Sequence, residues 1–473
     1  MNTNTFKNVL LIAALILSGC TTTQTVQHEI DQTRQEAFVQ WQASRQGQET
    51  SQIVLNQPLT LDNAIGLALS GNRALQSAQQ EKDTARGRII ESYEGVLPRV
   101  SLNGTYTRLN DDGADIDGMH IQTTQEDHYS GTLSVVQPLF MGGKASAALR
   151  AARYYETLVD EQLRLTSQKT IFDTIRAYNL VLLATEQLEV TRVYSDLALA
   201  HLDDVETRRK FGTASDFNVL RAQVEYSNAR SEMIRYQNQL NTTRTGLLKI
   251  IGVSQESSIT LTDSLIYEPL SVTEEESVRK AFENRPDLAL ATLSEKLQQE
   301  SLRAAHSEYW PTINGFYNLS RENPHPYLGT YDEWDTAWNT GIQVSIPLFN
   351  GLGREGRIAQ ERSKLEQSRI KTLDTRETAL FEVRNALLSL EDATELVETQ
   401  KLSVNQAREG LRIAEVGYRE GTIDQVSVLD ARAALTQAQL LYYQSLFEHS
   451  LARASLVFAQ GTLEFADKNQ KAD

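Results

Sequence analysis

The chain has 473 residues, of which 40 % are hydrophobic, 9 are proline and one is cysteine, and its formal net charge is −16. This acidity argues against nucleic acid as a partner, and the hydrophobic content is too high for a disordered chain. After Leu17 no stretch reaches the ~18 apolar residues that a membrane-spanning helix requires, so we expect any crossing of a bilayer to use β-strands.

The N-terminus has the features of a bacterial secretion signal. Lys7 gives a basic start, an apolar run extends from Val9 to Leu17, and small residues precede Cys20. The run Leu17-Ser18-Gly19-Cys20 resembles the lipobox of bacterial lipoproteins, which implies that Cys20 is acylated through sulfur and becomes the mature N-terminus. Residues 1–19 are then a lipoprotein signal peptide and residues 20–59 a lipid-anchored polar segment, and Thr21 favours the outer membrane. The alternative is an ordinary signal peptide with an incidental cysteine.

Residues 60–252 and 273–461 are similar enough to be two copies of one structural plan, with a linker at 253–272 and a tail at 462–473. Pro138 in the first copy matches Pro347 in the second, and Gly212 matches Gly421. Both pairs have the same offset of 209 (347 − 138 and 421 − 212). We therefore expect the two copies to form the same elements in the same order.

Each copy contains a segment in which apolar and polar residues alternate, the pattern of β-strands. The alternation predicts strands at about 98–109 and 128–140 in the first copy and at about 311–322 and 334–349 in the second. Strands of this length can cross a bilayer when tilted. The alternative is a soluble hairpin, against which stand aromatic residues suited to a membrane interface, namely Tyr327, Tyr331, Trp334 and Trp338. Four strands cannot close a barrel, so spanning strands would require several chains.

Long helices are expected after the strands. The stretches 144–210 and 352–420 lack proline, so each predicts one helix of about 100 Å, followed by return helices at 215–251 and 423–460. The second stretch repeats every seven residues, a coiled-coil period, at Val383, Leu390, Val397, Val404, Leu411 and Tyr418. The turns from strand to helix should contain Pro138, Gly142, Pro347 and Gly351, and the hairpin tips should contain Gly212, Thr213, Gly421 and Thr422.

Three basic residues, Arg208, Arg209 and Lys210, precede the first tip. They could bind an acidic partner, or they could compensate the negative end of a helix dipole. The sequence leaves both interpretations open.

The lipobox, the two-copy plan, the paired Pro-Leu-Phe turns and the Gly-Thr tips together resemble the TolC family of outer-membrane efflux channels, over nearly the whole mature chain. The resemblance implies a mainly α fold with a membrane β-element, in which each tandem repeat gives two transmembrane strands and a long helical hairpin. It also implies a homotrimer, with a twelve-strand β-barrel on a twelve-helix periplasmic tunnel.

The function implied by this family is that of a lipid-anchored channel of the cell outer membrane, extending into the periplasm. Such a channel is the passive exit duct of a tripartite efflux system. It would carry drugs, toxic compounds or metal ions from an inner-membrane pump, of the RND type, with which it is linked by a periplasmic adaptor protein. The sequence does not name the cargo, because a passive tunnel selects by size and charge.

In this family the tunnel closes at its periplasmic end, where the hairpin tips curl inward. By position, Asp430 would form a ring of three carboxylates at the aperture. Of the family's linking set only Tyr418 is retained, whereas Ser427 and Asn218 stand at positions of acidic residues and Ile423 at that of an arginine. The closed state is therefore expected to depend more on packing than on ion pairs.

No Walker loop, no His-Glu-x-x-His motif and no convincing nucleophile triad is present, so we expect neither an enzyme nor a cofactor or metal site. The acidic stretch 111–118 is similar to a calcium loop, but Gly113 stands where a ligand is needed, which favours a solvated loop. The main alternative function is a coiled-coil lipoprotein spacer of the cell envelope without a pore. A spacer would not require the four alternating strands.

Overall fold

The computed structural model describes residues 23–48, 58–110, 113–116, 118–122, 125–325 and 332–464. The chain divides into two compact units, a smaller one of residues 1–59 with 254–262 and a larger one of residues 60–253 with 263–473. Cys20, Tyr327 and Tyr331 lie outside the described residues. Within the described ranges, no helix is both long enough and apolar enough to cross a membrane.

The smaller unit contains one long helix, α2 (Thr23–Gln48), whose side chains between residues 26 and 43 are all exposed. Further along, Leu59 forms a parallel bridge with Leu261, and its N–H donates to the carbonyl of Thr260 at 2.8 Å. Helix α2 lies in the segment expected to be polar and lipid-anchored, for which the sequence pattern predicted no particular secondary structure.

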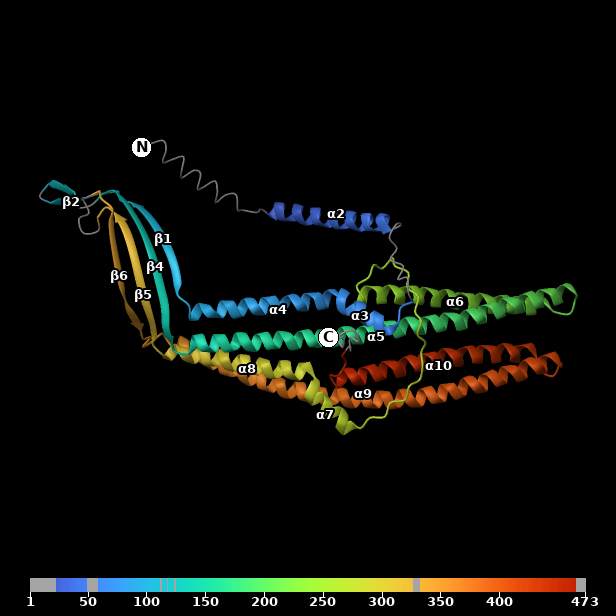
Figure 1. Ribbon diagram of the computed structural model, residues 1–473. Helices are drawn as coiled ribbons and strands as arrows, with labels where there is room; N and C mark the ends of the chain where they lie inside the picture. The colour runs from blue at the N-terminus through green and yellow to red at the C-terminus, as the bar shows by residue number, and fades with distance from the viewer. Residues whose placement is uncertain are drawn as a thin grey trace, which may run out of the picture. The chain divides into compact units, whose positions relative to one another are not determined.

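The larger unit consists of two repeats with the same order of elements (Figure 1). The first contains α3 (Leu61–Gly71), α4 (Arg73–Ser92), β1 (Arg99–Arg108), β4 (Asp127–Met141), α5 (Lys144–Lys210) and α6 (Asp216–Ile250). The second contains α7 (Glu274–Asn284), α8 (Pro286–His306), β5 (Thr312–Asn323), β6 (Asp335–Ser345), α9 (Gly353–Arg419) and α10 (Gln425–Ala459). Helices α5 and α9 have 67 residues each, and α6 and α10 have 35 each. The predicted fold class, mainly helical repeats with a small β-element, is confirmed.

The four main strands form one antiparallel sheet in the order β1-β4-β5-β6. Tyr106 pairs with Tyr129 across β1 and β4, and Leu319 of β5 pairs with both Leu133 of β4 and Trp338 of β6. The two repeats therefore meet at the central pair β4 and β5, while β1 and β6 are the edges.

Two details of the strands differ from the sequence prediction. The strand expected at 334–349 ends at Ser345, which pairs with Thr312, the first residue of β5. The chain beyond it has no strand to pair with, and Pro347 has no N–H to donate. The loop between the first two strands contains a short antiparallel hairpin, β2 (Gly113–Ile116) with β3 (Met119–Gln122), where only a solvated loop was expected.

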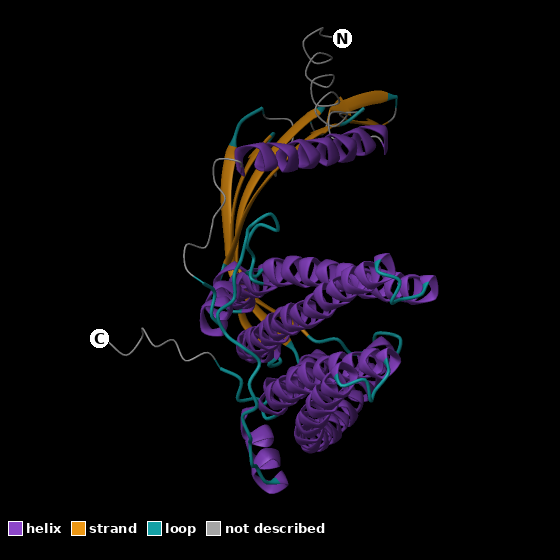
Figure 2. Cartoon of the chain, turned by 90° about the vertical axis from the view of Figure 1, so that its right-hand side faces the viewer, coloured by secondary structure: helices purple, strands orange, loops and turns teal. Residues whose placement is uncertain are grey.

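The helices are arranged in the same order as the strands to which they are joined. Helix α5 packs against α4 and α6 of its own repeat and against α8 and α10 of the other, and α9 packs against α8 and α10. Figure 2, seen from the side of the tips, shows the hairpins as two pairs of helices. Helices α4 and α6 on one side, and α9, which also packs against α7, on the other, form the two edges of the helical layer.

Helix α9 has two buried stripes with a period of seven residues. The predicted stripe is buried at Val383, Leu390, Val397 and Val404. Sequence reasoning missed a second stripe, whose later members are small or polar. It consists of Ile358, Leu365, Thr372, Ala379, Ala386 and Ala393. Two stripes three or four positions apart are the packing pattern of a coiled coil.

The return helix of the first repeat ends against the junction between α3 and α4. Gly252 has a φ of 74°, and a Cβ built on it would lie 2.3 Å from the carbonyl oxygen of Gly71. The side chain of Asn72 caps α4 through its oxygen and donates from Nδ2 to the carbonyl of Ile250 at 3.1 Å. Only glycine fits at position 252, because any Cβ would collide with backbone.

The second repeat has the same arrangement. Gly461, with a φ of 69°, would place a Cβ 2.7 Å from Cα of Arg285, at the junction between α7 and α8. The guanidinium of Arg285 donates to the carbonyl of Ala459 at 3.2 Å and pairs with Asp287 and Glu382 at 2.7 and 2.6 Å. In each repeat, the chain at the end of the return helix, α6 or α10, thus makes a backbone contact with the junction between the two short helices, α3 and α4 or α7 and α8.

Of the four residues expected in the turns from strand to helix, Gly142, Pro347 and Gly351 lie between a strand and a helix, whereas Pro138 lies within β4. Pro138 lies at a register shift of β4, and Gly142, with a φ of 62°, approaches the carbonyl of Ser307 so closely that a Cβ would lie 2.5 Å from it. In the second repeat Gly351 has a φ of 66°, and the carbonyl of Pro347 accepts a hydrogen bond from Arg354 at 3.2 Å.

Candidate functional site at the hairpin tips

The two hairpins end in the same turn. Gly212 and Gly421 have φ values of 73° and 75°, in the left-handed region that glycine adopts at little cost. The N–H groups of Thr213 and Thr422 donate to the carbonyls five positions earlier, at 2.9 and 2.8 Å, and their hydroxyls donate to the same carbonyls at 3.0 and 3.1 Å. These bonds satisfy the last carbonyls of α5 and α9 and reverse the chain.

The return helices begin with equivalent caps. The hydroxyl of Ser215 accepts from the N–H of Asn218 at 3.3 Å, and the carboxylate of Asp424 accepts from the N–H of Ser427 at 2.8 Å. The bond from the Ser427 backbone lowers the pKa of Asp424. Asn218 and Ser427 both occupy the third position of their helix, where Ser427 is exposed and Asn218 is half-buried.

A hydrogen bond joins the two tips directly. Nη1 of Arg208, on α5, donates to the hydroxyl of Tyr418, on α9, at 3.2 Å. The guanidinium carbon lies 5.8 Å from the centre of the tyrosine ring, and Asp204 pairs with the same guanidinium at 2.9 Å. Arg208, which the sequence presented only as part of a basic cluster, is thus the partner of Tyr418.

A second contact joins α5 to the start of α10. Nε2 of Gln425 lies 2.6 Å from Nε2 of His201, which is half-buried. Next to it Arg432 of α10 pairs with Glu415 of α9 at 3.1 Å. Among the described residues at the tips, no ion pair crosses between the hairpins, so the two cross-links are hydrogen bonds.

Asp430 lies on α10 with an exposed side chain, and it forms no ion pair with any residue that the structure describes. The tip of the first hairpin also exposes large apolar side chains, with Phe211 79 % and Phe217 69 % exposed. Sequence reasoning missed them, although an aromatic residue on each side of the Gly212 turn is an unusual choice for a solvated loop.

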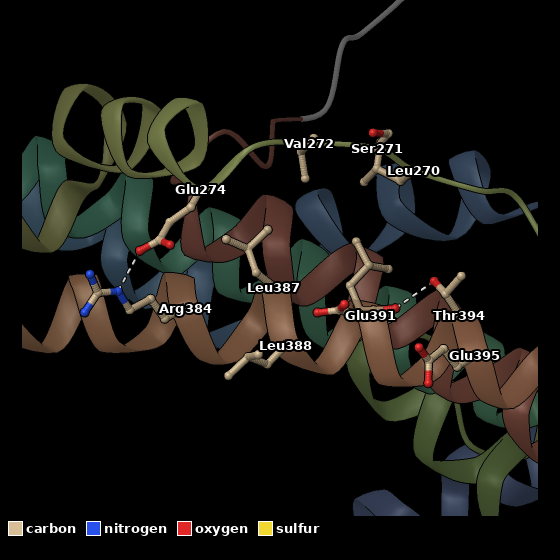
Figure 3. A pocket seen from close by; sticks show the side chains of 11 residues that line it. Leu270, Ser271, Val272, Glu274, Arg384, Leu387, Leu388, Glu391, Thr394 and Glu395 are labelled. Atoms are coloured by element: carbon tan, nitrogen blue, oxygen red, sulfur yellow. Dashed lines mark hydrogen bonds and ion pairs between the residues drawn. The ribbon is translucent and has the colours of Figure 1, made fainter.

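A groove of about 710 Å³ lies on α9, far along the helix from the tip. Residues 270–272, which lead into α7, form one side of it, and α9 forms the other side, with Leu387 extending toward that segment (Figure 3). Glu274 pairs with Arg384 at 2.7 Å at one end. In the described ranges no group of three or more His, Cys, Asp or Glu residues is arranged to hold a metal ion.

The comparisons with known proteins agree with this architecture. The family described as outer membrane efflux protein matches residues 64–253 and 278–462, one match for each repeat. The outer membrane protein TolC of Salmonella enteritidis is 24 % identical over 422 residues, covering 87 % of this chain and 84 % of that protein. The cobalt-zinc-cadmium resistance protein CzcC of Cupriavidus metallidurans is 22 % identical over 391 residues, covering 81 % and 86 %.

Among solved structures, the Campylobacter jejuni CmeC outer membrane channel superposes with a TM-score of 0.76. The match covers 87 % of this chain and 88 % of that one, at 14 % sequence identity. At this identity the likeness supports the fold alone.

Proposed function

The chain belongs to the outer membrane efflux protein family, and we propose that it acts as the passive exit duct of a tripartite efflux system. The channel would carry drugs, toxic compounds or metal ions from an inner-membrane pump of the RND type, through a periplasmic adaptor, to the exterior. The relative CzcC, named for cobalt-zinc-cadmium resistance, supports metal ions as a cargo. The relative TolC, an outer membrane protein, supports the role in that membrane. A channel family also points away from an enzyme.

The proposed assembly is a homotrimer, and its support is the pair of open edges of the sheet. Strands β1 and β6 each have one unpaired side, and backbone groups left unpaired in lipid cost several kcal/mol each. The two edges differ, so association of β6 of one copy with β1 of the next is head-to-tail, and such an arrangement makes a ring when its rotation closes. Three copies, the number implied by the family, give the twelve strands of the proposed barrel.

The helical layer has matching exposed edges. Helix α9 carries exposed apolar residues along one side, at Ile370, Leu373, Phe381, Leu388, Leu396 and Leu402. The opposite edge, on α6, exposes Phe217, Leu220, Val224 and Ile234. Such extended apolar stripes on a monomer mark an association surface, and the groove beside Leu388 (Figure 3) would lie in it.

The proposed channel also has a lipid anchor at its N-terminus and a gate at the hairpin tips. Acylation of Cys20 would hold the outer-membrane protein at the lipid surface, with the helices in the periplasm. Tyr418, Asp430, Ser427 and Asn218 would surround the periplasmic aperture. In support, Tyr418 is linked to the other hairpin, Asp430 and Ser427 are exposed, and Asn218 lies in the first turn of α6 at the tip.

Two measurements on the purified chain separate this function from that of a coiled-coil spacer. Cross-linking in detergent should give a species of three chains, and the same preparation should conduct ions across a planar bilayer. A stable monomer, or a trimer without conductance, would contradict the channel and favour the spacer.

A further inference from the structure

The contact between His201 and Gln425 places a titratable group between the two hairpins. Nε2 of Gln425 lies 2.6 Å from Nε2 of His201. An amide NH₂ group only donates hydrogen bonds, so the ring nitrogen must accept. A neutral imidazole with its proton on Nδ1 can accept, whereas the charged imidazolium carries N–H groups at both nitrogens and has no acceptor.

The groups around His201 oppose its protonation. Burial, Arg432 of α10 and Arg208 of α5 lower its pKa, and Asp204 of α5 acts in the opposite direction. Asp204 is already paired with Arg208 at 2.9 Å, which limits what it offers a charged histidine.

The two guanidinium groups are fixed by other elements packed at the same place. Arg432 pairs with Glu415 of α9, and Arg208 donates to Tyr418 of α9. From α6 come Glu225 and Arg221. Burial raises the pKa of Glu225, while the positive charges of Arg432 and Arg221 act in the opposite direction. Since the positive charges beside His201 are held in place, a proton on its ring cannot be accommodated by moving them away.

We propose that His201 and Gln425 form a proton-sensitive latch, closed when His201 is neutral and released when it is charged, so that acid on the tip side loosens the gate. This inference rests on the proposed function, in which the tips close the channel. Its ligand is the proton, and His201 is a positioning residue that acts through the contact between α5 and α10.

The direction follows from linkage. His201 has a lower pKa with the hairpins together than in a separated hairpin, where about 6.5 is expected. The latch is therefore at full strength above pH ~6.5 and weakens as the pH falls below it. The opposite outcome requires the Gln425 amide to turn and offer its oxygen to the imidazolium. Arg432 and Arg208 disfavour that arrangement, because it places a third positive charge beside them.

The test is the single-channel conductance of the full chain in planar bilayers, with the tip side at pH 7.5 and then at pH 5.5. Acid should raise the wild-type conductance roughly threefold. His201→Gln, which stays neutral, should give the low value at both pH values, and His201→Lys, which stays charged, the high value at both. His306→Gln, at an exposed histidine at the end of α8, is the matched control and should respond like the wild type.

A second measurement reports the tips without conductance. Spin labels at Thr213→Cys and Thr422→Cys, one on each tip and in a Cys20→Ser background, should move apart on acidification, and His201→Gln should abolish the movement. An acid response that persists unchanged in His201→Gln, or that narrows the channel, would overturn the latch and leave the channel itself intact. Absence of conductance from every variant would overturn both the latch and the proposed function.

Discussion

Arg208 of the first repeat donates a hydrogen bond of 3.2 Å to the hydroxyl of Tyr418 of the second, which links the two hairpins at their tips. The two residues are 210 positions apart, one more than the repeat offset of 209 (421 − 212), so the link joins non-equivalent positions. The position equivalent to Arg208 is Gly417 and the position equivalent to Tyr418 is Arg209, so the contact is asymmetric within one chain.

Removing this link should loosen the closed tips. Tyr418→Phe keeps the ring beside the guanidinium but loses the hydroxyl, and Arg208→Ala loses both interactions. A hydrogen bond of this kind is worth about 1 kcal/mol, so the ratio of open to closed channels should rise about fivefold in Tyr418→Phe and at least as much in Arg208→Ala. Single-channel recordings measure the ratio. Arg412→Ala, whose guanidinium pairs with Glu409 on the same helix, should leave it unchanged.

Asp430 should make the channel prefer cations. Three carboxylates brought together at the narrow end attract counter-ions, so Asp430→Ala should bring the ratio of cation to anion permeability close to one and remove block by trivalent metal ions. Reversal potentials in a salt gradient measure the ratio. Asp83→Ala, on α4 and paired with Arg86, serves as the control. An unchanged reversal potential in the Asp430 variant would show that this carboxylate does not line the aperture.

Lipidation should depend on Cys20 and assembly should not. Cys20→Ser should incorporate no labelled palmitate, while cross-linking in detergent should still give the trimer, because paired strands rather than acyl chains close the proposed barrel. Palmitate that still enters the mutant would refute the lipobox interpretation.

Gly252→Ala should destabilise the fold. The new Cβ would lie 2.3 Å from the Gly71 carbonyl oxygen, on a residue with a φ of 74°. The expected loss is about 1–3 kcal/mol, seen as a lower unfolding temperature. Gly246→Ala, within the preceding helix α6, is the control: nothing lies within 4 Å of its Cβ, so it should gain about 0.5–1 kcal/mol. Equal effects of both variants would contradict the close backbone approach.

His449 should make the fold sensitive to acid. Its side chain is fully buried against Tyr267, with ring centres 4.8 Å apart, and neither ring nitrogen has a hydrogen-bond partner among the described residues. Burial and Arg453 lower its pKa, whereas Glu268, which pairs with Arg453 at 2.5 Å, acts in the opposite direction. Because the unfolded chain takes up the proton more readily, stability should be constant above pH ~6.5 and fall below it.

The matching variant for that prediction is His449→Phe, which keeps an aromatic ring against Tyr267 and removes the titratable nitrogens. The fall in unfolding temperature from pH 7.5 to pH 5.5 should be smaller in this variant than in the wild type. An identical fall in both would assign the acid sensitivity to other groups.

The sequence predicted the parts of the fold that depend on local pattern. The heptad through Val383 and Val397 predicted a buried face of α9, and both residues are buried. The second stripe was not predicted, because Thr372 and Ala379 differ little in hydrophobicity from the residues around them. Their burial depends on which helix lies opposite. Likewise, the glycines at 252 and 461 were recognisable as equivalent, but their contacts with Gly71 and Arg285 come from distant parts of the chain.

The candidate site was predictable only in outline. The tips could be located from Gly212 and Gly421, because a glycine at the end of a long helix indicates a reversal. The partners across the hairpins could not, since the link from Arg208 to Tyr418 and the contact of His201 with Gln425 depend on how two long helices are aligned. A shift of one turn in that alignment would pair other residues.

The equal lengths of the helices limit how such a protein can change over evolutionary time. Helices α5 and α9 both have 67 residues, and α6 and α10 both have 35, so the two tips end at the same level. Seven residues inserted into one hairpin arm alone would move its tip by about 10 Å and separate Arg208 from Tyr418. Insertions or deletions should therefore survive only when both repeats acquire them together. A change in the length of the helical hairpins would therefore require the same insertion or deletion in both repeats. Relatives with longer or shorter hairpins should differ by whole heptads in each copy.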